Sequence, residues 1–334
     1  MGGVYAITGS SGYIGTRMTR LLLERDPECT VIGMDVRPPR GELATHPRLE
    51  HHTVDVRDPR LRAILVGREV SALLHFAFVL DPFYDEKEMT DIDLGGTRNV
   101  LQAALEAKIP WLLATSSTTA YGALGDNPVP LDEGMPTRAR PDFNYAHDKR
   151  LMDELLRDFA ARHPEVGVCV VRPCIVLGPN VSNYIAATLV SLPVTSLLDG
   201  ADPETQFVHE DDVVGLIWRC IDRRATGVFN AVGKGTLRST DLARLQGKRT
   251  MKVPYRLARG LTWAVWRAKL LGWSMPPGVV DYFRFPWVAS GAKAARELDF
   301  EPRYSSEECF RIILARKDAI VSDFKARMTA RGKR

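Results

Sequence analysis

The sequence predicts an α/β protein built on a doubly wound parallel sheet, followed by a smaller C-terminal cap. In the first half of the chain, short apolar runs alternate with stretches of helical periodicity, which is typical of βαβ units. The apolar runs are nearly continuous, as expected for strands that helices cover on both faces. With 334 residues, 45% of them hydrophobic, the chain is long enough to bury such a core.

The expected elements follow one another in a regular order. "VYAIT" (Val4 to Thr8) is an apolar strand pattern, and apolar residues recur at helical spacing over Tyr13 to Glu24. Thr30 to Asp35 is the next expected strand. The remaining elements of this half are expected strands at Leu49 to Val56, Val70 to Ala77, Trp111 to Ser117 and Val166 to Pro173, and helices at Lys87 to Ala107 and Asn144 to Arg162.

After Pro173 the regular alternation ends, and segments rich in proline and glycine separate short helical patterns. "ATGVFNAVG" (Ala225 to Gly233) still resembles a strand that returns to the main sheet. The predicted division is therefore a sheet domain at 1–173 with 207–233 returning to it, and a substrate-binding cap at 174–206 and 234–334.

Composition excludes several classes of protein. The net charge is only +4, and the one short basic stretch, Lys325 to Arg334, is expected to be a solvated chain end, so no nucleic-acid partner is predicted. Five scattered cysteines without a CxxC pair indicate neither a metal site nor a disulfide framework. Reduced thiols favour a cytoplasmic location. No apolar run approaches the roughly 20 residues of a membrane span.

Three glycines, Gly9, Gly12 and Gly15, lie between the first strand and the first helix, in "ITGSSGYIG". Glycine at such a turn lets the backbone approach a pyrophosphate, and the helix N-terminus supplies N–H donors. The turn therefore predicts a Rossmann-type dinucleotide site. The intervening residues assigned to the same site are Ser11, Tyr13 and Ile14.

The second expected strand ends at Asp35, about 20 residues beyond the glycine turn. A carboxylate there accepts hydrogen bonds from the adenosine ribose hydroxyls and repels a 2′-phosphate. NAD is therefore favoured over NADP, although Arg37 and Arg40 lie just beyond and offset part of the repulsion.

"YAHDK" places Tyr145 and Lys149 four residues apart, on one face of an expected helix. An ammonium near the phenol is expected to lower the pKa of Tyr145 towards neutrality. Tyr145 would then exchange a proton with a substrate hydroxyl while hydride moves to or from a nicotinamide. Ser117, at the end of the fifth expected strand, is placed to hydrogen-bond the substrate oxygen.

These motifs together resemble the extended short-chain dehydrogenase/reductases, the NAD-dependent epimerase/dehydratase family. The resemblance runs from Val4 to Gly233, with a further likeness to the family's C-terminal signature at Ala294 to Pro302. It rests on "TGSSGYIG", "HFA", "TSSTTAYG", "YAHDK", "RPCIVLGP" and "FVHEDDVV", which occur in the family's order and spacing.

The resemblance implies roles at matching positions. Tyr145 would be the catalytic acid/base, Ser117 the active-site hydroxyl, and Lys149 a ligand of the nicotinamide ribose that lowers the pKa of the tyrosine. Further cofactor contacts are implied at Asp55 and Val56 beside the adenine, Phe76 and Ala77 in the cleft, and Pro173 near the nicotinamide. One departure is Asp93, where the family usually has Asn. It is left out of the predicted site.

The substrate prediction rests on two differences from nucleotide-sugar members of the family. An Asn expected within "RPCIVLGP" is replaced by Cys174 or Ile175, and an Arg expected before "FVH" is replaced by Gln206. Without such partners a pyrophosphate is costly to bind. A non-nucleotide, fairly apolar secondary alcohol or ketone is therefore favoured as the substrate.

Aromatic residues of the cap fit an apolar pocket, although an ordinary cap core is favoured for them, and attachment of a helix to a membrane surface is a further alternative. They lie in "LARGLTWAVWRAKLLGW" (Leu257 to Trp273, with Trp263 and Trp266) and in "DYFRFPWV" (Asp281 to Val288). After the fourth expected strand, Phe78, Leu80, Phe83 and Tyr84 are expected to add an apolar wall.

Two alternatives stay open at this point. The first is a nucleotide-sugar epimerase, which returns the hydride to the opposite face of the ketone. The second, a smaller possibility, is a non-catalytic NAD(P)-binding sensor or scaffold. The positions where a dehydratase would show an acidic pair hold Thr118 and Thr119. The resemblance also implies a homodimer formed through the two long helices, Lys87 to Ala107 and Asn144 to Arg162.

Overall fold

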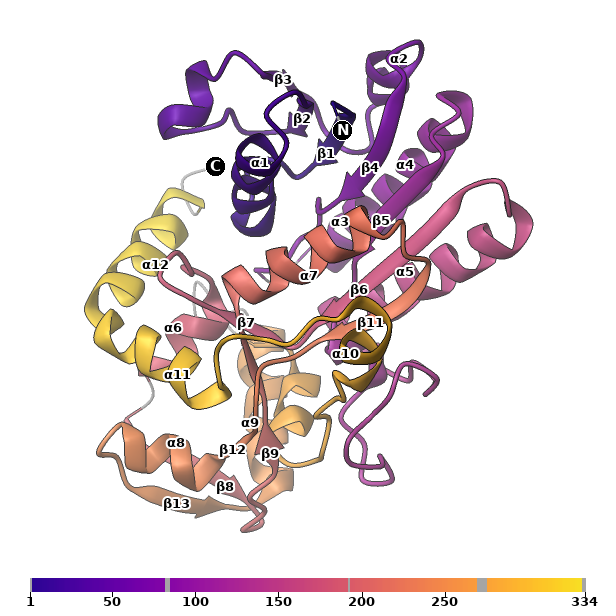
Figure 1. The fold of residues 1–334 in the computed structure, drawn as a ribbon. Coiled ribbons are helices and arrows are strands. Elements are labelled where there is room, and N and C mark those ends of the chain that lie inside the picture. The colour runs from indigo at the N-terminus through magenta and orange to yellow at the C-terminus, as the bar shows by residue number, and fades with distance from the viewer. Residues whose placement is uncertain (1, 82–84, 192, 269–274, 332–334) are drawn as a thin grey trace.

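The computed structural model describes residues 2–81, 85–191, 193–268 and 275–331, and its centre is a seven-stranded parallel sheet (Figure 1). The strands are β1 (Val4–Thr8), β2 (Thr30–Asp35), β3 (Leu49–Thr53), β4 (Val70–His75), β5 (Trp111–Thr115), β6 (Gly167–Pro173) and β11 (Gly227–Ala231). Their order across the sheet is β11-β6-β5-β4-β1-β2-β3. The predicted fold class is confirmed, and the expected strand over Ala225 to Gly233 does pair with β6.

Helices cover both faces of this sheet. On one face lie α1 (Tyr13–Arg25), α7 (Glu210–Asp222) and α10 (Ala292–Leu298); on the other lie α2 (Arg60–Leu65), α4 (Gly96–Glu106) and α5 (Asn144–Arg162). Strand β1 illustrates the arrangement, because Tyr5 and Ile7 pack into the first core while Ala6 packs into the second. Successive side chains of a strand point to opposite faces, so the continuous apolar runs fill two cores.

The strand order reverses between β1 and β4, and ligands of open α/β sheets bind in the crevice at such a switch point. The segments that leave the two strands touch there: Gly9 follows β1, and the backbone of Phe76 and Ala77 follows β4. This crevice is the natural place for the predicted cofactor site.

The long helix expected over Lys87 to Ala107 is divided in the structure. It consists of α3 (Glu86–Thr90), a π-helical segment η2 (Asp91–Gly95) and α4. The π-helical segment shifts the helix register by one residue, and such segments are often found at functional sites. Asp93 lies within it and is fully buried.

The rest of the chain forms shorter elements beside the sheet (Figure 1). They are β7 (Ile175–Leu177), α6 (Tyr184–Ser191), β8 (Thr195–Leu198), β9 (Glu204–Thr205), β10 (Phe207–His209), β12 (Leu237–Arg238), α8 (Ser239–Leu245), β13 (Thr250–Val253), α9 (Tyr255–Ala268), α11 (Ser306–Ala315) and α12 (Lys317–Arg331), with 3-10 turns η1 (Gly41–Thr45), η3 (Thr118–Tyr121) and η4 (Pro277–Phe283). The strands pair two by two as β7 with β10, β8 with β13 and β9 with β12.

One expectation for this region is corrected. Helix α10, expected in the cap, packs on β11, where Lys293 donates to the carbonyl of Val228 at 2.8 Å. The basic C-terminal stretch, expected to be a solvated end, is helical in α12 as far as Arg331, and Lys325 and Ala326 at its start are exposed. Ile320 and Phe324 hold this helix in a core shared with α6 and α11.

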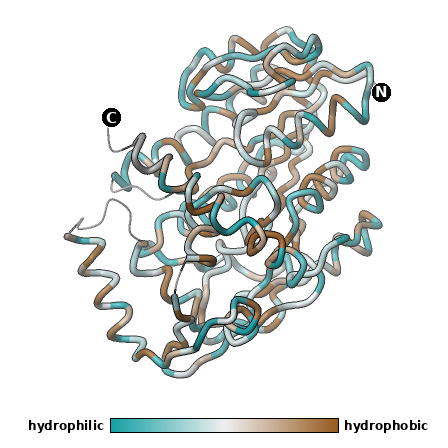
Figure 2. The backbone as a smooth tube through the Cα atoms, turned by 90° about the vertical axis from the view of Figure 1, so that its left-hand side faces the viewer, coloured by the Kyte–Doolittle hydropathy of each residue, from teal (hydrophilic) through white to brown (hydrophobic). Residues whose placement is uncertain are grey.

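Helix α9 is not part of a cap core, contrary to one expectation for its aromatic residues. None of its residues is buried, and Leu257, Leu261 and Trp263 are each more than half exposed. Figure 2 shows this helix at the periphery, with hydrophobic residues along it. On its inner side, Arg259 forms ion pairs with Asp142 and Asp281.

A buried carboxylate, Glu210, joins the sheet domain to the segment after β7. It accepts hydrogen bonds from the hydroxyl of Tyr13 and from Asn180, and it lies 2.9 Å from a guanidinium nitrogen of Arg17. Tyr13 and Arg17 belong to α1, and Glu210 begins α7. The fully buried Glu210 therefore holds the start of α1 against both the beginning of α7 and the segment that contains Asn180.

Within the part of the chain that the structure describes, no helix is long and apolar enough to cross a bilayer. All five cysteines are buried and unpaired, as expected for reduced thiols. The described residues also contain no group of His, Cys, Asp or Glu side chains that would hold a metal ion.

Candidate active site

The glycine turn after β1 is held by close backbone contacts. Gly9 has φ +71°, and a Cβ atom there would lie 2.6 Å from the backbone nitrogen of Ala77. A Cβ at Gly15 would lie 2.0 Å from the carbonyl oxygen of Gly9. Because no side chain fits at either position, the turn requires glycine for its own packing.

Gly12 lies at the N-terminus of α1. It is the N-cap of that helix, no side chain caps the first turn, and no acidic residue lies in it. Ser11, Gly12, Tyr13 and Ile14 are half-buried, so this edge is accessible. The uncapped N–H groups and the helix dipole suit a phosphate, and the residues present therefore fit a dinucleotide.

Asp35 lies at the end of β2, buried beside the glycine turn. Its carboxylate accepts from the backbone N–H of Ser11 at 3.1 Å and of Arg37 at 2.9 Å. An ionised carboxylate has about four acceptor positions, so two remain for ribose hydroxyls. The Arg37 guanidinium is largely exposed, with its Nε 3.6 Å from the same carboxylate. The structure therefore has both the carboxylate that favours NAD and the nearby guanidinium of Arg37 that offsets part of its repulsion of a 2′-phosphate.

The residues expected near the adenine have their own partners. Asp55 receives two guanidinium hydrogen bonds from Arg57, at 2.9 and 3.0 Å, which hold the pKa of that carboxyl below its usual range. Val56 is buried, and its side chain fills the space above Gly96. The Asp55 side chain is therefore committed to Arg57, an arrangement that sequence spacing did not predict.

Ser117, Pro173 and Tyr145 come together where β5 and β6 end. The Ser117 hydroxyl accepts from the backbone N–H of Thr119 at 3.1 Å and donates to the carbonyl of Pro173 at 3.3 Å. Tyr145 is in the first turn of α5, and a hydrogen bond to Ser117 lowers its pKa, although burial has the larger, opposite effect. The structure thus groups these three predicted residues.

Lys149 corrects the predicted electrostatics. Its ammonium donates to the carbonyl of Thr115 at 2.7 Å and lies 3.4 Å from the ring centroid of Phe78, but 6.0 Å from that of Tyr145. Burial and the nearby Asp93 raise the pKa of Tyr145 to about 12. The expectation that Lys149 lowers this pKa is therefore wrong for the geometry seen here, because the ammonium is directed at β5 and the Phe78 ring.

Aromatic rings pack around Tyr145. Phe78 meets its ring edge-on at 5.7 Å between centroids, and Phe143 lies at 5.9 Å. Tyr282 packs edge-on against Phe143 and donates its hydroxyl to the carbonyl of Thr119 at 2.7 Å. We call Phe78, Phe143 and Tyr282 the aromatic wall.

Two described residues that were expected in an apolar wall or pocket, Leu80 and Trp263, take no part in the aromatic wall. Trp263 is exposed on α9. Phe83, Tyr84 and Trp273, which were also expected there, lie outside the described residues. Leu80 is half-buried and packs against the core around α6 and α11. Sequence reasoning missed Phe143, although its place two residues before Tyr145 at the start of an expected helix was a usable signal.

Comparison with known proteins identifies the family of the chain. The family model described as the NAD dependent epimerase/dehydratase family matches residues 5–232. The chain belongs to this family.

An uncharacterized protein of Mycobacterium tuberculosis is 21% identical over 92% of this chain and 82% of its own length. Among solved structures, a UDP-glucose 4-epimerase from Stenotrophomonas maltophilia, with bound NAD and formylated UDP-arabinopyranose, is 20% identical with a TM-score of 0.72, over 95% of this chain and 98% of that one. A dTDP-glucose 4,6-dehydratase from Bacillus anthracis, in complex with NAD, is 16% identical with a TM-score of 0.70, over 97% and 99%.

The two positions expected to bind substrate phosphates in nucleotide-sugar members of the family are occupied differently here. Gln206 is buried and hydrogen-bonds the backbone of Ala289 twice, at 3.0 and 3.1 Å. Cys174 is buried, and Ile175 belongs to β7. None of the three presents a charge to an anion, and the Gln206 amide already has its partners.

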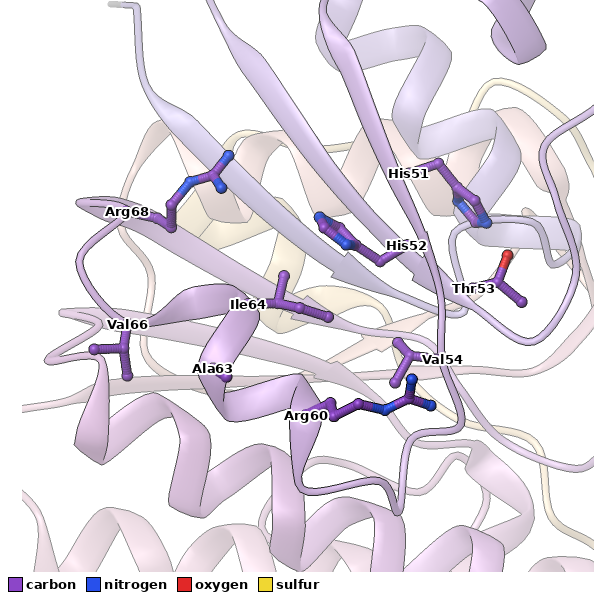
Figure 3. Close-up of a pocket in the computed structure, with 9 residues that line it drawn as sticks. All are labelled: His51, His52, Thr53, Val54, Arg60, Ala63, Ile64, Val66 and Arg68. Atoms are coloured by element: carbon purple, nitrogen blue, oxygen red, sulfur yellow. The ribbon is translucent and has the colours of Figure 1, made fainter.

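A separate open hollow of about 740 Å³ lies at the sheet edge, between β3 and α2 (Figure 3). Its two arginines are already paired, Arg60 with Asp58 and Arg68 with Glu50. It lies apart from the carboxyl ends of β5 and β6, where Ser117 and Tyr145 meet, and none of the predicted site residues lines it.

Proposed function

We propose that this chain is an NAD-dependent enzyme that transfers hydride between the cofactor and a secondary-alcohol or ketone carbon of a small molecule. The observation that carries the proposal is the grouping of Ser117, Tyr145 and Pro173 at the same sheet edge as the glycine turn and Asp35. In an open α/β sheet this edge is where ligands bind.

The proposed mechanism assigns a task to each residue. The N–H groups at the start of α1 hold the pyrophosphate, and Asp35 holds the adenosine ribose. Bound NAD would supply the hydride acceptor. Ser117 would orient the substrate oxygen against Tyr145, which gives that oxygen a proton from its phenol during reduction and takes one as a phenolate during oxidation. Oxidation therefore requires the phenol to lose its own proton first. The aromatic wall limits the access of water to this proton.

Nucleotide sugars are the substrate class that the comparisons favour. Both solved structures described above are nucleotide-sugar enzymes similar to this chain over nearly its whole length. In an epimerase of this kind the ketone turns before hydride returns, so the cofactor is regenerated in each cycle. The nucleotide-sugar epimerase hypothesis therefore predicts no net formation of NADH.

An apolar, non-nucleotide alcohol is the second candidate, and a specific observation favours it. The Gln206 amide is used by Ala289, and the surroundings of Tyr145 are the rings of Phe78 and Phe143. An aromatic wall suits a substrate with little charge. A dehydrogenase of this kind forms one NADH for each alcohol oxidised.

A thermal-shift comparison separates the two candidates. The melting temperature is measured with NAD⁺ or NADP⁺, and then with UDP, UDP-glucose or dTDP added to the preferred cofactor. A ligand that binds only the native state at 100 times its Kd adds about 2.7 kcal/mol of stability. A further rise with UDP or dTDP supports the nucleotide-sugar reading. A response to NAD⁺ alone directs the search to apolar alcohols, and no response to either dinucleotide contradicts the proposed function.

Tyr145→Phe tests the proton transfer once a substrate turns over. The variant keeps the ring and loses the hydroxyl, so we expect it to bind NAD⁺ normally and to react about 100- to 10,000-fold more slowly. Tyr255→Phe is the matched control. It removes the hydroxyl of a tyrosine on α9 that hydrogen-bonds Asp281, and it should retain the wild-type rate. Turnover of Tyr145→Phe at the wild-type rate would show that another group carries the proton.

A further inference from the structure

Helix α9, at the periphery of the molecule (Figure 2), presents an apolar stripe to solvent. Leu257, Leu261, Ala264 and Ala268 recur at the spacing i, i+4, i+7 and i+11, which places them along one side of the helix. All four are exposed. We call them the outer stripe. A contiguous exposed apolar row of this kind is typical of a surface that binds a partner or a membrane.

Two arginines and a tryptophan border the outer stripe. Arg256, Trp263 and Arg267 follow the spacing i, i+7 and i+11 on the neighbouring side of the helix, and all three are exposed. We call them the basic flank. The helix contains no acidic residue, and Asp199, which lies near Arg256, already forms an ion pair with Arg284. The basic flank is therefore complementary to an anionic surface.

The opposite side of α9 is attached to the protein by polar and aromatic contacts. Arg259 forms ion pairs with Asp142 and, at 2.7 Å, with Asp281. The hydroxyl of Tyr255 donates to Asp281 at 2.6 Å, and its ring packs edge-on against Phe285. Since Tyr255 and Arg259 lie one turn apart, across the helix from the outer stripe, these contacts hold the stripe towards solvent.

A lipid surface suits this combination better than a second copy of the chain. In an interfacial helix the aliphatic side chains enter the acyl region, tryptophan lies at the level of the headgroups, and arginine stems extend to the phosphates. With 14 residues, α9 is roughly 21 Å long, too short to cross a bilayer but long enough to lie along one. A second copy would instead bring two basic helices against each other.

We propose that α9 is a membrane-docking helix, which lies flat on an anionic lipid bilayer with the outer stripe in the apolar zone and the basic flank at the lipid phosphates. The inference goes beyond the proposed function and does not depend on it. Asp142 and Asp281, which hold Arg259, directly precede Phe143 and Tyr282 of the aromatic wall in the sequence. The docking helix is therefore attached to the same segments that carry the aromatic wall.

Sedimentation with lipid vesicles tests the proposal on the full-length protein. The protein is mixed with vesicles of phosphatidylcholine alone, or of an equal mixture of phosphatidylcholine and phosphatidylglycerol, and the bound fraction is measured against lipid concentration. We expect the protein to partition onto the anionic vesicles and more weakly onto the neutral ones. The difference should shrink as the salt concentration rises, because salt screens the attraction of the basic flank.

Substitutions separate the apolar from the charged contribution. Leu261→Ser removes an aliphatic side chain from the outer stripe and should weaken partitioning onto anionic vesicles at least about tenfold. Arg267→Gln removes one charge from the basic flank and should weaken it about fivefold. Val66→Ser, at an exposed apolar residue after α2, and Arg296→Gln, at an exposed arginine of α10, are the matched controls and should bind as the wild type does.

A fluorescence measurement locates the contact on α9. Vesicles with brominated acyl chains quench the emission of a tryptophan that enters the bilayer. The quenching seen with wild type should fall in Trp263→Phe, in which the remaining ring preserves binding. Trp218→Phe, at a residue of α7 that packs against the core of the sheet domain, is the control and should leave the quenching unchanged.

Three outcomes would overturn the proposal. The first is absence of binding to anionic vesicles by the wild type. The second is equal binding of wild type and Leu261→Ser, which would assign the attraction to net charge alone. The third is a stable dimer that vesicles do not displace and that Leu261→Ser dissociates, which would assign the outer stripe to a second copy of the chain. If Leu261→Ser fails to fold, Arg267→Gln and the quenching in Trp263→Phe provide the decisive comparisons.

Discussion

Gly15 is the residue with the least room for change in the glycine turn. A side chain there would meet the carbonyl oxygen of Gly9 at 2.0 Å, which is backbone and cannot turn aside. Gly15 is also the third residue of α1, where N–H groups remain free for an anion. One added methyl group would therefore disturb both the packing of the turn and the direction of those donors.

We expect Gly15→Ala to lower the free energy of unfolding by about 1–3 kcal/mol. It should also weaken NAD⁺ binding by at least about tenfold, which corresponds to about 1.4 kcal/mol. Chemical denaturation and calorimetry measure the two effects. Gly125→Ala is the control, because its Cβ would lie an ordinary 3.5 Å from the ring of Phe285. Unchanged NAD⁺ affinity in Gly15→Ala would contradict the assignment of this turn.

The contacts of single residues in the site could be predicted from the sequence only in part. The spacing of Tyr145 and Lys149 correctly predicts a shared helix, and the strand end correctly places Ser117 near the tyrosine. The direction of the Lys149 ammonium depends on the carbonyl of Thr115 and the ring of Phe78, which lie 34 and 71 residues away in sequence. No local pattern encodes such contacts.

At the scale of elements, the strands and helices of the sheet domain follow the predicted order closely, because two covered faces leave strong apolar patterns. Helix α9 shows where the pattern misleads. Leu257, Leu261 and Trp263 are each more than half exposed, and Arg259 binds the helix to the protein through ion pairs with Asp142 and Asp281. Amphipathic spacing predicted the helix correctly but could not predict which side faces the protein.

The exposure of α9 gives a prediction about its substitutions. Leu261→Lys should change the free energy of unfolding by less than about 0.5 kcal/mol, since Leu261 is 63% exposed, and should reduce self-association in light scattering. Gly260→Ala should stabilise the protein by up to about 1 kcal/mol, because nothing lies within 4 Å of the added methyl group. Leu216→Lys, at a fully buried position of α7, should unfold it. Strong destabilisation by Leu261→Lys would mean that α9 packs through its apolar side.

At the scale of the whole molecule, the protonation of one buried histidine couples the stability of the protein at low pH to the packing of the central strands. His75 is buried at the end of β4, with Nδ1 2.7 Å from the hydroxyl of Thr8 on β1 and Nε2 3.1 Å from that of Thr97 on α4. Burial lowers its pKa to about 3, so protonating it requires the central strands to separate. Its contribution to stability is complete above its unfolded pKa of about 6.5 and is lost as the pH falls below that value.

We expect the wild-type free energy of unfolding to fall between about pH 6.5 and 4, with this histidine contributing at most about 1.4 kcal/mol per pH unit. His75→Gln should show a shallower slope over this range, whatever its absolute stability. Urea denaturation at several pH values measures the slope. His163→Gln, at a partly exposed histidine paired with Glu165, is the control. Identical slopes in His75→Gln and wild type would exclude this source of acid sensitivity.

The contacts of Glu210 also bear on whether the chain can be cut into parts. A fragment ending at Pro173 would contain Tyr13 and Arg17 but lack the carboxylate that both of them bind. It would also expose the edge of β6, whose partner β11 comes more than 50 residues later in the chain. A cut at residue 173 alone therefore separates parts that the predicted sheet domain, with 207–233 returning to it, keeps together. The contacts of Tyr13 and Arg17 with Glu210 can form only after the α7 segment has been synthesised.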